Sequence, residues 1–443
     1  MIRNTKLALS IVLLGSAFAA NADLLFYDSA APGPYKWCNR VVTGTGGSQG
    51  IQTFNATNDG FISLENWNCF EKAWFQWKKG GGAELPVNGS TFSTLESEET
   101  TQVGANVTRT IVVSQRDPGF GNKILETTLV FKLVPVSVDN TNPGLSKAYL
   151  QCDWTVKNIS TSAQSFSTYA LADMYSTISG IGGNSDDTCS VVSGGIGQNN
   201  LRVSWSSPSV ANSPTVYFDV TGSNLIAAGE ISSGVTPPVR TKLTDSASDT
   251  LSGAMTGGSS NNWAAGIQYN HNLAIGQSTS GRFRYGYNVL PSTVSGKVTL
   301  DALSVPMTGK QVTVDLRTPS TLTVIESKLV TLDVNGNYSF ETTNTGSYDV
   351  AIKGSHFLRK VVPGVSITGA GATVSAVTLR NGDATNDNFA DFFDYLVLNA
   401  GYETESPDPI YVTNQGADFN EDGTIDFFDY LILSDQYETQ GDD

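Results

Sequence analysis

Short runs of alternating apolar and polar residues fill the chain from residue 23 to about residue 290. Because successive side chains of a strand point to opposite faces, this period of two predicts strands with one buried face. Glycine, serine, asparagine and proline fill the intervals, and no stretch shows a long helical period. We therefore expect a large all-β domain at 23–290, one extended β-sandwich or two packed ones. The clearest runs are 109–115, 126–136, 148–159 and 282–289.

A second β-rich segment covers residues 293–380. Its runs include "KQVTVDLRT", and "VNGNYSFETT" places an Asn-Gly turn between strands. About ninety residues in roughly seven strands fit an immunoglobulin-like β-sandwich. The opening "SGKVTL" and the later "GSYDVAIKGS" resemble carboxypeptidase-regulatory-like modules. That resemblance implies a spacer domain.

From residue 381 the pattern changes, because an acidic loop followed by an apolar segment occurs twice. "DATNDNFADFFDYLVL" begins at Asp383, and "DFNEDGTIDFFDYLIL" begins 35 residues later at Asp418. The triplet "YET" at 402–404 recurs at 437–439 with the same offset. Since no gap is needed, the two segments are copies of one unit. An in-register repeat with an apolar segment attached argues against a solvated acidic tail.

The spacing of the acidic residues matches that of calcium ligands. Ca²⁺ takes about six to eight oxygens, which a twelve-residue loop supplies from positions 1, 3, 5, 9 and 12 and the carbonyl of position 7. The chain must turn sharply at position 6, where Gly423 turns freely and Asn388 tolerates the left-handed region. We therefore expect two calcium ions and tighter binding at the second loop, loop 2, than at the first, loop 1. The predicted ligands are Asp383, Thr385, Asp387, Phe389 (carbonyl), Asp391 and Asp394 in loop 1, and Asp418, Asn420, Asp422, Thr424 (carbonyl), Asp426 and Asp429 in loop 2.

With these residues, 381–440 resembles the dockerin modules of secreted bacterial proteins. Their hallmark is two tandem calcium loops, each followed by a helix, with Asp at position 12, as at Asp394 and Asp429. No helix precedes the first loop, because "VTLRNG" at 377–382 has the pattern of a strand end. The resemblance implies a small α-helical calcium-binding module at 381–443. It also implies docking to a cohesin-like module or another extracellular protein.

Two pairs of phenylalanines stand at loop positions 10 and 11, residues that in dockerins often help to contact the partner. The family commonly has small or hydroxylated residues there. The 35-residue offset predicts equivalent places for the two pairs about a pseudo-two-fold axis. Two interpretations stay open, a partner-binding surface and core packing between the halves. The pairs are Phe392-Phe393 and Phe427-Phe428.

The net charge of −16 is concentrated in the repeat. Residues 381–443 hold 16 of the 42 acidic residues and none of the 26 Lys and Arg, so the rest of the chain is balanced. No basic patch indicates nucleic-acid binding. The start of the chain has the pattern of a signal peptide, with basic "MIRNTK", apolar "LALSIVLLGSAF" and small residues up to Ala22. We expect a mature chain from Asp23, no transmembrane segment, and a protein secreted outside the cell, free or associated with the cell surface.

Four cysteines are consistent with disulfides in an oxidising compartment. They are Cys38, Cys69, Cys152 and Cys189, and three pairings are possible. Proximity in sequence favours Cys38–Cys69 and Cys152–Cys189. A zinc site is disfavoured, because no CxxC spacing occurs.

Catalytic signatures are scarce. His271 and His356 lack neighbours at metal-ligand spacing, and "GTGGSQG" at 44–50 is followed by no helix that would present amides to a phosphate. A pair of carboxylates, which is all that a glycoside hydrolase needs, stays possible. The stretch "NWNCFEKAWFQW" at 66–77 offers rings for sugar stacking or for the core. On a strand, Phe75 and Trp77 would share one face.

Two functions follow. We favour a non-catalytic cell-surface or matrix protein whose large β-domain binds a glycan or packs with other subunits, and whose calcium module docks it. The alternative is a polysaccharide-degrading glycoside hydrolase carried to a scaffold by its dockerin. Two carboxylates about 5–10 Å apart in a groove of the β-domain would favour the enzyme.

Overall fold

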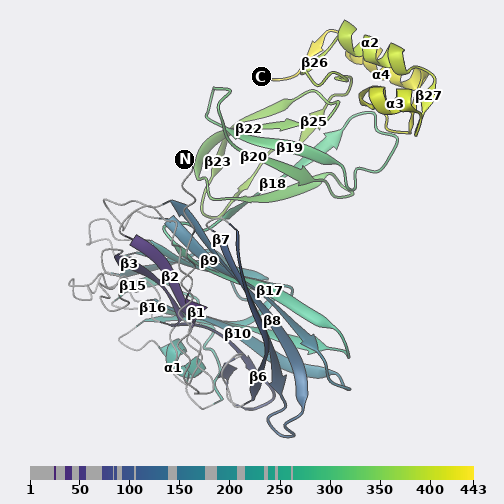
Figure 1. The fold of residues 1–443 in the computed structure, drawn as a ribbon. Helices are drawn as coiled ribbons and strands as arrows, with labels where there is room; N and C mark the ends of the chain where they lie inside the picture. The colour runs from purple at the N-terminus through teal and green to yellow at the C-terminus, as the bar shows by residue number, and fades with distance from the viewer. Residues whose placement is uncertain are drawn as a thin grey trace, which may run out of the picture. The chain divides into compact units, whose positions relative to one another are not determined.

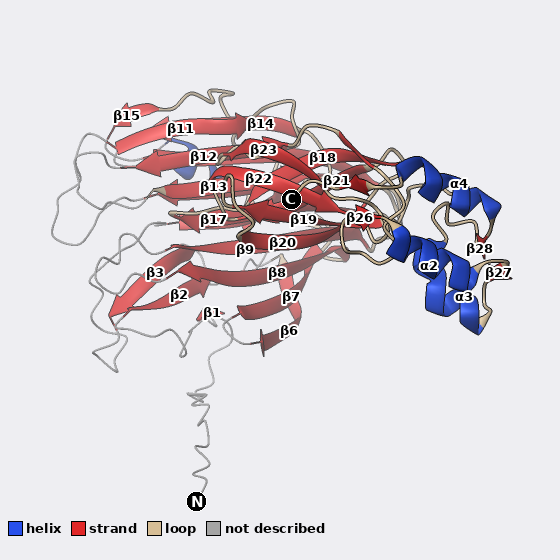
Figure 2. Cartoon of the chain, turned by 90° about the horizontal axis from the view of Figure 1, so that it is seen from above, coloured by secondary structure: helices blue, strands red, loops and turns tan. Residues whose placement is uncertain are grey.

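Strands make up most of the described chain, as the period of two predicts (Figure 2). In this computed structural model the chain divides into two units, residues 1–289 and residues 290–443. The structure describes residues 72–82, 84–86, 92–103, 106–137, 147–174, 187–206, 215–233, 238–244, 248–260 and 263–443, and the backbone of strands β1 (Leu24–Leu25), β2 (Tyr35–Val41) and β3 (Gln49–Asn55). The predicted signal peptide lies outside these residues. No helix in the described part is long and apolar enough to cross a membrane.

The first unit is built on two large antiparallel sheets. The long strands β7, β8, β9 and β17 lie side by side in the larger sheet (Figure 1), and each contains all or most of one of the runs predicted from the sequence. The larger sheet has the order β15 (Gly258–Ser260), β11 (Asp187–Gly194), β12 (Asn200–Ser206), β13 (Val216–Gly222), β17 (Ser278–Tyr287), β9 (Lys147–Asn158), β8 (Lys123–Ser137), β7 (Asn106–Arg116), β6 (Ser93–Val103). The smaller has the order β14 (Ile226–Ser233), β16 (Trp263–Leu273), β10 (Gln164–Met174), β4 (Lys72–Lys78), β5 (Leu85–Pro86).

One hydrophobic core joins these two sheets. Phe75 and Trp77 of β4 belong to it together with Trp154 of β9 and Phe283 of β17, and the rings of Phe75 and Trp154 lie 5.1 Å apart. The core interpretation of the aromatic stretch is therefore correct for Phe75 and Trp77. Its residues 66–71 lie outside the described ones, and so does the side chain at position 74.

A short helix that the sequence pattern did not predict covers part of the smaller sheet. Helix α1 (Pro238–Thr244) buries Val239 and Leu243 against Tyr169 and Leu171 of β10. These β10 residues alternate with Phe166 and Ala170, which belong to the core between the sheets. The smaller sheet is thus buried on both faces near α1.

The predicted bridge between Cys152 and Cys189 is wrong, because both are free, buried thiols. Cys152 lies on β9 and Cys189 on β11, and β12, β13 and β17 separate these strands in the sheet. Since neighbouring strands lie about 4.8 Å apart, the two residues are far beyond the reach of a disulfide, about 7 Å between Cα atoms. Burial raises the pKa of the Cys189 thiol to about 12, so it stays protonated. Cys38 and Cys69 lie outside the residues whose side chains are described.

The second unit contains a smaller β-sandwich. Its core joins Val298 of one sheet to Leu316 and Ile352 of the other. One sheet has the order β21 (Asn337–Thr342), β18 (Ser292–Leu300), β24 (Ala372–Thr373), with β25 (Val377–Leu379) also paired to β18. The other has the order β20 (Val324–Thr331), β19 (Gln311–Arg317), β22 (Gly346–Lys353), β23 (Lys360–Ile367).

The Asn335-Gly336 turn connects β20 to β21, and these strands belong to different sheets. Gly336 has a φ of 79°, and a Cβ atom placed on it would lie 2.0 Å from the carbonyl oxygen of Val298. The glycine therefore serves both the turn and the close approach of the turn to β18, the neighbour of β21 in its sheet.

Three helices and four two-residue strands follow the sandwich and stand at the yellow end of the ribbon (Figure 1). Strand β25 precedes the first loop, as the strand-like pattern of residues 377–382 predicts. The elements are β26 (Phe389–Ala390), α2 (Phe392–Gly401), β27 (Thr404–Glu405), α3 (Pro409–Asn414), a 3-10 turn (Gln415–Ala417), β28 (Thr424–Ile425), α4 (Phe427–Gln436) and β29 (Thr439–Gln440).

Candidate functional site

The two copies of the repeat interlock. Helices α2 and α4 begin 35 residues apart, as do β26 and β28. Strand β26 pairs with β29, and β27 pairs with β28, so each copy contributes one strand to each pair. This exchange gives the repeat the pseudo-two-fold arrangement expected from its constant offset.

The core of the repeat also uses equivalent residues. Leu398 of α2 and Leu433 of α4 are both buried in it, together with Phe419. Leu358, which precedes the repeat, belongs to the same core. The places of Phe419 and Leu358 could not be predicted from sequence, because apolar residues outside a periodic run carry no signal of where they pack.

The four phenylalanines are not part of that core. The exposed fractions are 52% for Phe392 and 61% for Phe393, against 54% for Phe427 and 62% for Phe428. The near-identity of these values shows that both pairs stand in equivalent places. The alternative of core packing between the halves is therefore wrong. Leu396, Tyr402, Leu431 and Tyr437 of the two copies are also exposed and extend the apolar surface.

Each helix is fixed to its loop by a reciprocal cap. The carboxylate of Asp391 accepts a hydrogen bond from the Phe393 amide at 2.7 Å, and Asp394 Oδ2 accepts one from the Asp391 amide at 2.7 Å. Asp426 and Asp429 repeat this arrangement at α4. Loop positions 9 and 12 therefore set where each helix begins. They place positions 10 and 11, the phenylalanines, on the first turn.

Loop 2 closes around Asp418 and Asp429. Asp429 Oδ1 accepts hydrogen bonds from the Phe419 and Asn420 amides at 2.7 and 3.2 Å. Asp418 Oδ2 accepts from the Gly423 amide at 3.0 Å and from the Tyr411 hydroxyl at 2.7 Å. Burial raises the pKa of Asp418, and burial raises the pKa of Asp429 to about 6. Two buried carboxylates in one small loop repel each other, and a positive charge bound near them would stabilise their ionised forms.

One atom of loop 2 identifies where that charge would bind. Asp418 Oδ1 is buried and receives no hydrogen bond from any residue that the structure describes. A buried carboxylate oxygen without a donor is costly, and a hard cation would satisfy it. Loop 2 therefore fits an oxygen-seeking cation such as Ca²⁺. Calcium binding stays a prediction, because no three His, Cys, Asp or Glu side chains gather as a metal-holding group in the described parts of the chain.

Loop 1 has a similar path and different partners. Asp383 Oδ1 accepts from the Asp387 amide at 3.0 Å, and Oδ2 accepts from the Asn388 amide at 2.9 Å. Asp394 Oδ1 accepts from the Thr385 amide at 2.8 Å. Asn388 has a φ of 74° and Gly423 a φ of 92°, so position 6 is left-handed in both loops, as expected.

Side chains of the β-sandwich also contact the loops. The Lys353 ammonium donates to Asp383 Oδ2 at 2.8 Å, and Lys310 pairs with Glu421 of loop 2. His356 is buried with its Nε2 3.7 Å from Glu421 Oε1. Burial lowers the pKa of His356 to about 4, with the nearby Lys353 and Lys310 adding to the effect. Lys353, Lys310, Glu421 and Tyr411 were not found from sequence, and the place of His356 beside loop 2 was not predicted. The Asp408-Pro409 pair at the start of α3 was a usable signal for the helix that carries Tyr411.

A paired-carboxylate site in the first unit would need a groove that brings two acidic side chains together. A groove of about 370 Å³ lies over β10 and β16, and its lining includes Ser167, Tyr169, Gln268 and Asn270. Asp249 is the one acidic residue among the described residues that line it. This groove does not bring two carboxylates together.

His271 is a structural residue of the same unit. It is buried, and its Nε2 lies 2.8 Å from Thr168 Oγ1 while its Nδ1 lies 2.9 Å from the Asn224 amide nitrogen. Burial lowers the pKa of His271 to about 4. Both ring nitrogens have partners, so the ring is held neutral in the core.

Neither a protein-family model nor a curated protein matches the chain. Among solved structures, a type II cohesin–X-dockerin complex from Acetivibrio cellulolyticus aligns at 25% identity over 34% of this chain and 97% of that chain, with a TM-score of 0.28. A galactose mutarotase-like protein from Lactobacillus casei aligns at 11% identity over 59% of this chain and 99% of that one, with a TM-score of 0.31. A galactose mutarotase-like protein from Clostridium acetobutylicum aligns at 10% identity over 57% of this chain and 92% of that chain, with a TM-score of 0.29.

Proposed function

We propose that this is a secreted, non-catalytic protein whose segment 381–443 binds calcium and docks the chain to an extracellular protein. Secretion rests on the signal-peptide pattern of residues 1–22. Docking rests on one observation: two phenylalanine pairs, placed alike on α2 and α4 by two acidic loops, face solvent. Exposed aromatic clusters of this kind mark protein interfaces, where large rings supply most of the binding energy.

Calcium has a defined part in this proposal. The residues that would hold it are those of the two loops, and in loop 2 the buried Asp418 Oδ1 supplies an oxygen in need of a cation. Loop positions 9 and 12 also cap the helices that carry the phenylalanines. A cation that orders the loops therefore orders the docking surface. The partner is a protein with an apolar surface, such as a cohesin-like module.

Calorimetric titration of the full chain with Ca²⁺ tests the first half of the proposal. We expect two binding steps, one of which is lost in Asp418→Asn. Asp435→Asn is the matched control, because Asp435 is an exposed residue of α4 outside the loops. Binding to a cohesin-like module, measured with calcium and with a chelator, tests the second half. No calcium binding by the unaltered chain would refute the proposal.

A further inference from the structure

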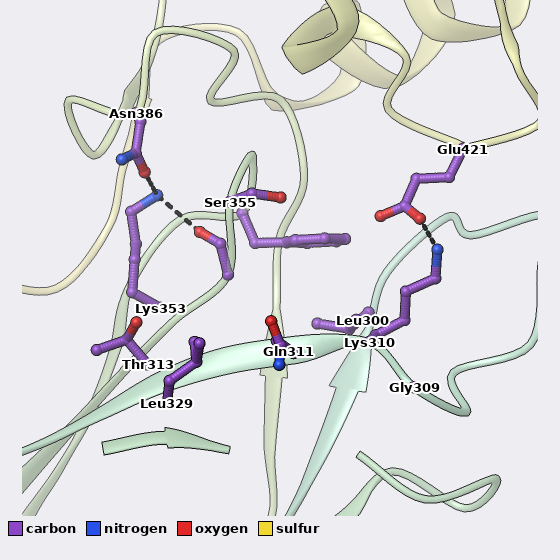
Figure 3. Close-up of a pocket in the computed structure, with 12 residues that line it drawn as sticks. Leu300, Gly309, Lys310, Gln311, Thr313, Leu329, Lys353, Ser355, Asn386 and Glu421 are labelled. Atoms are coloured by element: carbon purple, nitrogen blue, oxygen red, sulfur yellow. Dashed lines mark hydrogen bonds and ion pairs between the residues drawn. The ribbon is translucent and has the colours of Figure 1, made fainter. Parts of the chain in front are cut away.

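Lys353 places a fixed cation at the first ligand position of loop 1. It is the last residue of β22, and its Nζ donates to Asp383 Oδ2 at 2.8 Å, to Asn386 Oδ1 at 2.7 Å and to the Gly354 carbonyl at 3.1 Å. The Asp383 side chain is fully buried, and that of Lys353 is only 13% exposed. Figure 3 shows the Lys353 side chain directed at Asn386. The ammonium thus lies among three oxygens, two of them from loop 1.

Loop 2 has a neutral donor in the equivalent place. Oδ2 of the position 1 aspartate accepts the amide of position 6 in both loops. Its second donor is the Lys353 ammonium in loop 1 and the Tyr411 hydroxyl in loop 2, at 2.7 Å. Both loops carry four aspartates, but only the first has one of them paired with a lysine among the described contacts.

The other lysine that reaches the loops does not alter this difference. Lys310 pairs with Glu421 at position 4 of loop 2 (Figure 3). Glu421 is an additional acid beyond the four aspartates and is not a predicted ligand. The charges of Lys310 and Glu421 therefore cancel each other, and the ligand aspartates of loop 2 keep their full negative charge.

We propose that the β-sandwich makes the two loops unequal, because the Lys353 ammonium takes the part of a metal cation at loop 1 and weakens calcium binding there. This inference rests on the proposed calcium-binding function and adds the cause of the inequality. Calcium affinity is set by the number of ligand charges, and Lys353 neutralises one of four. A positive charge a few ångströms from a divalent ion weakens its binding by on the order of tenfold even at high effective dielectric. Loop 2, with Tyr411 and the unpaired Asp418 Oδ1, is the strong site.

Calcium titration of the full chain by calorimetry tests the inference. We expect two steps that differ at least tenfold in affinity, with the weaker one lost in Asp387→Asn. Lys353→Met keeps much of the apolar stem and removes the charge, so the weaker step should tighten by about tenfold while the stronger one stays unchanged. Lys353→Arg keeps the charge and should leave the weaker step weak. Lys310→Met is the matched control and should change neither step by more than about twofold.

Each result has a separate meaning. An unchanged or weakened first-loop step in Lys353→Met would show that Lys353 only positions Asp383, and would overturn the inference. Equal affinities in the unaltered chain would overturn it as well, while leaving the proposed calcium function intact. No calcium binding by the unaltered chain would refute the proposed function and this inference together. If Lys353→Met fails to fold, Lys353→Gln supplies the same neutral comparison, and circular dichroism checks the fold of every variant.

Discussion

Two leucines of α4 separate the core face of the helix from its exposed face. Leu433 is 2% exposed and lies in the core with Leu398, Phe419 and Ile425, whereas Leu431 is 47% exposed. Leu433→Ala should therefore destabilise the repeat by about 2–5 kcal/mol, the range for buried leucines. Leu431→Ala should cost about 1 kcal/mol or less, because roughly half of that side chain is already in water.

Hydrogen exchange of the full chain, followed peptide by peptide, can measure this difference. A gap of about 2 kcal/mol between the variants corresponds to about 30-fold faster exchange of the α4 peptide in Leu433→Ala. The chain provides an internal reference, because all seven tryptophans precede residue 290. Tryptophan fluorescence thus reports on the first unit, and its unfolding midpoint should stay the same in both variants. Equal acceleration by the two substitutions would refute the assignment of the α4 faces and remove the basis for an exposed docking surface.

Three further predictions concern other parts of the chain. Replacing Phe427 and Phe428 by alanine should change the stability of the repeat by no more than about 1 kcal/mol. Partner binding in a pull-down should persist, because Phe392 and Phe393 of the other copy offer an equivalent surface, and replacing both pairs should abolish partner binding. Burial lowers the pKa of His271 to about 4, so between about pH 6.5 and 4 the unfolded chain binds a proton that the folded chain does not. The free energy of unfolding of the first unit should therefore fall by up to about 3 kcal/mol as the pH drops from about 6.5 to 4. Urea unfolding followed by tryptophan fluorescence should show a shallower dependence of this free energy on pH in His271→Gln, and an equal dependence would contradict the assignment. Gly336→Ala should cost about 2 kcal/mol or more, because φ is 79° and the new Cβ would meet a carbonyl oxygen; faster hydrogen exchange in β18 and β21 would report it.

The alternating pattern predicted β7, β8, β9 and β17 because it depends only on which residues face the core. It could not predict their order, since β9 pairs with both β8 and β17, and β17 is more than a hundred residues away in sequence. The same limit explains the wrong disulfide. Closeness in sequence placed Cys152 with Cys189, whereas sheet order holds them apart.

At the candidate site, the 35-residue offset was enough to predict two equivalent loops and helices. It could not decide whether the phenylalanines lie in the core or on the surface, because two adjacent apolar residues at the start of a helix are compatible with both positions. That choice is made by Leu398 and Leu433, the leucines that α2 and α4 bury in the core of the repeat. Lys353 also had no local signal, because it comes from a strand that ends thirty residues before Asp383.

The position of Leu358 determines which piece of this chain can be moved to another protein. It belongs to the core of the repeat although it precedes residue 381. The Arg359 amide donates to Asn388 Oδ1 at 2.7 Å, and the Val361 amide donates to Asp442 Oδ2 at 2.9 Å. A tag cut at residue 381 would leave these partners behind and open the core to water. We therefore expect residues 290–443, and not residues 381–443 alone, to be the piece that keeps its fold when moved to another protein.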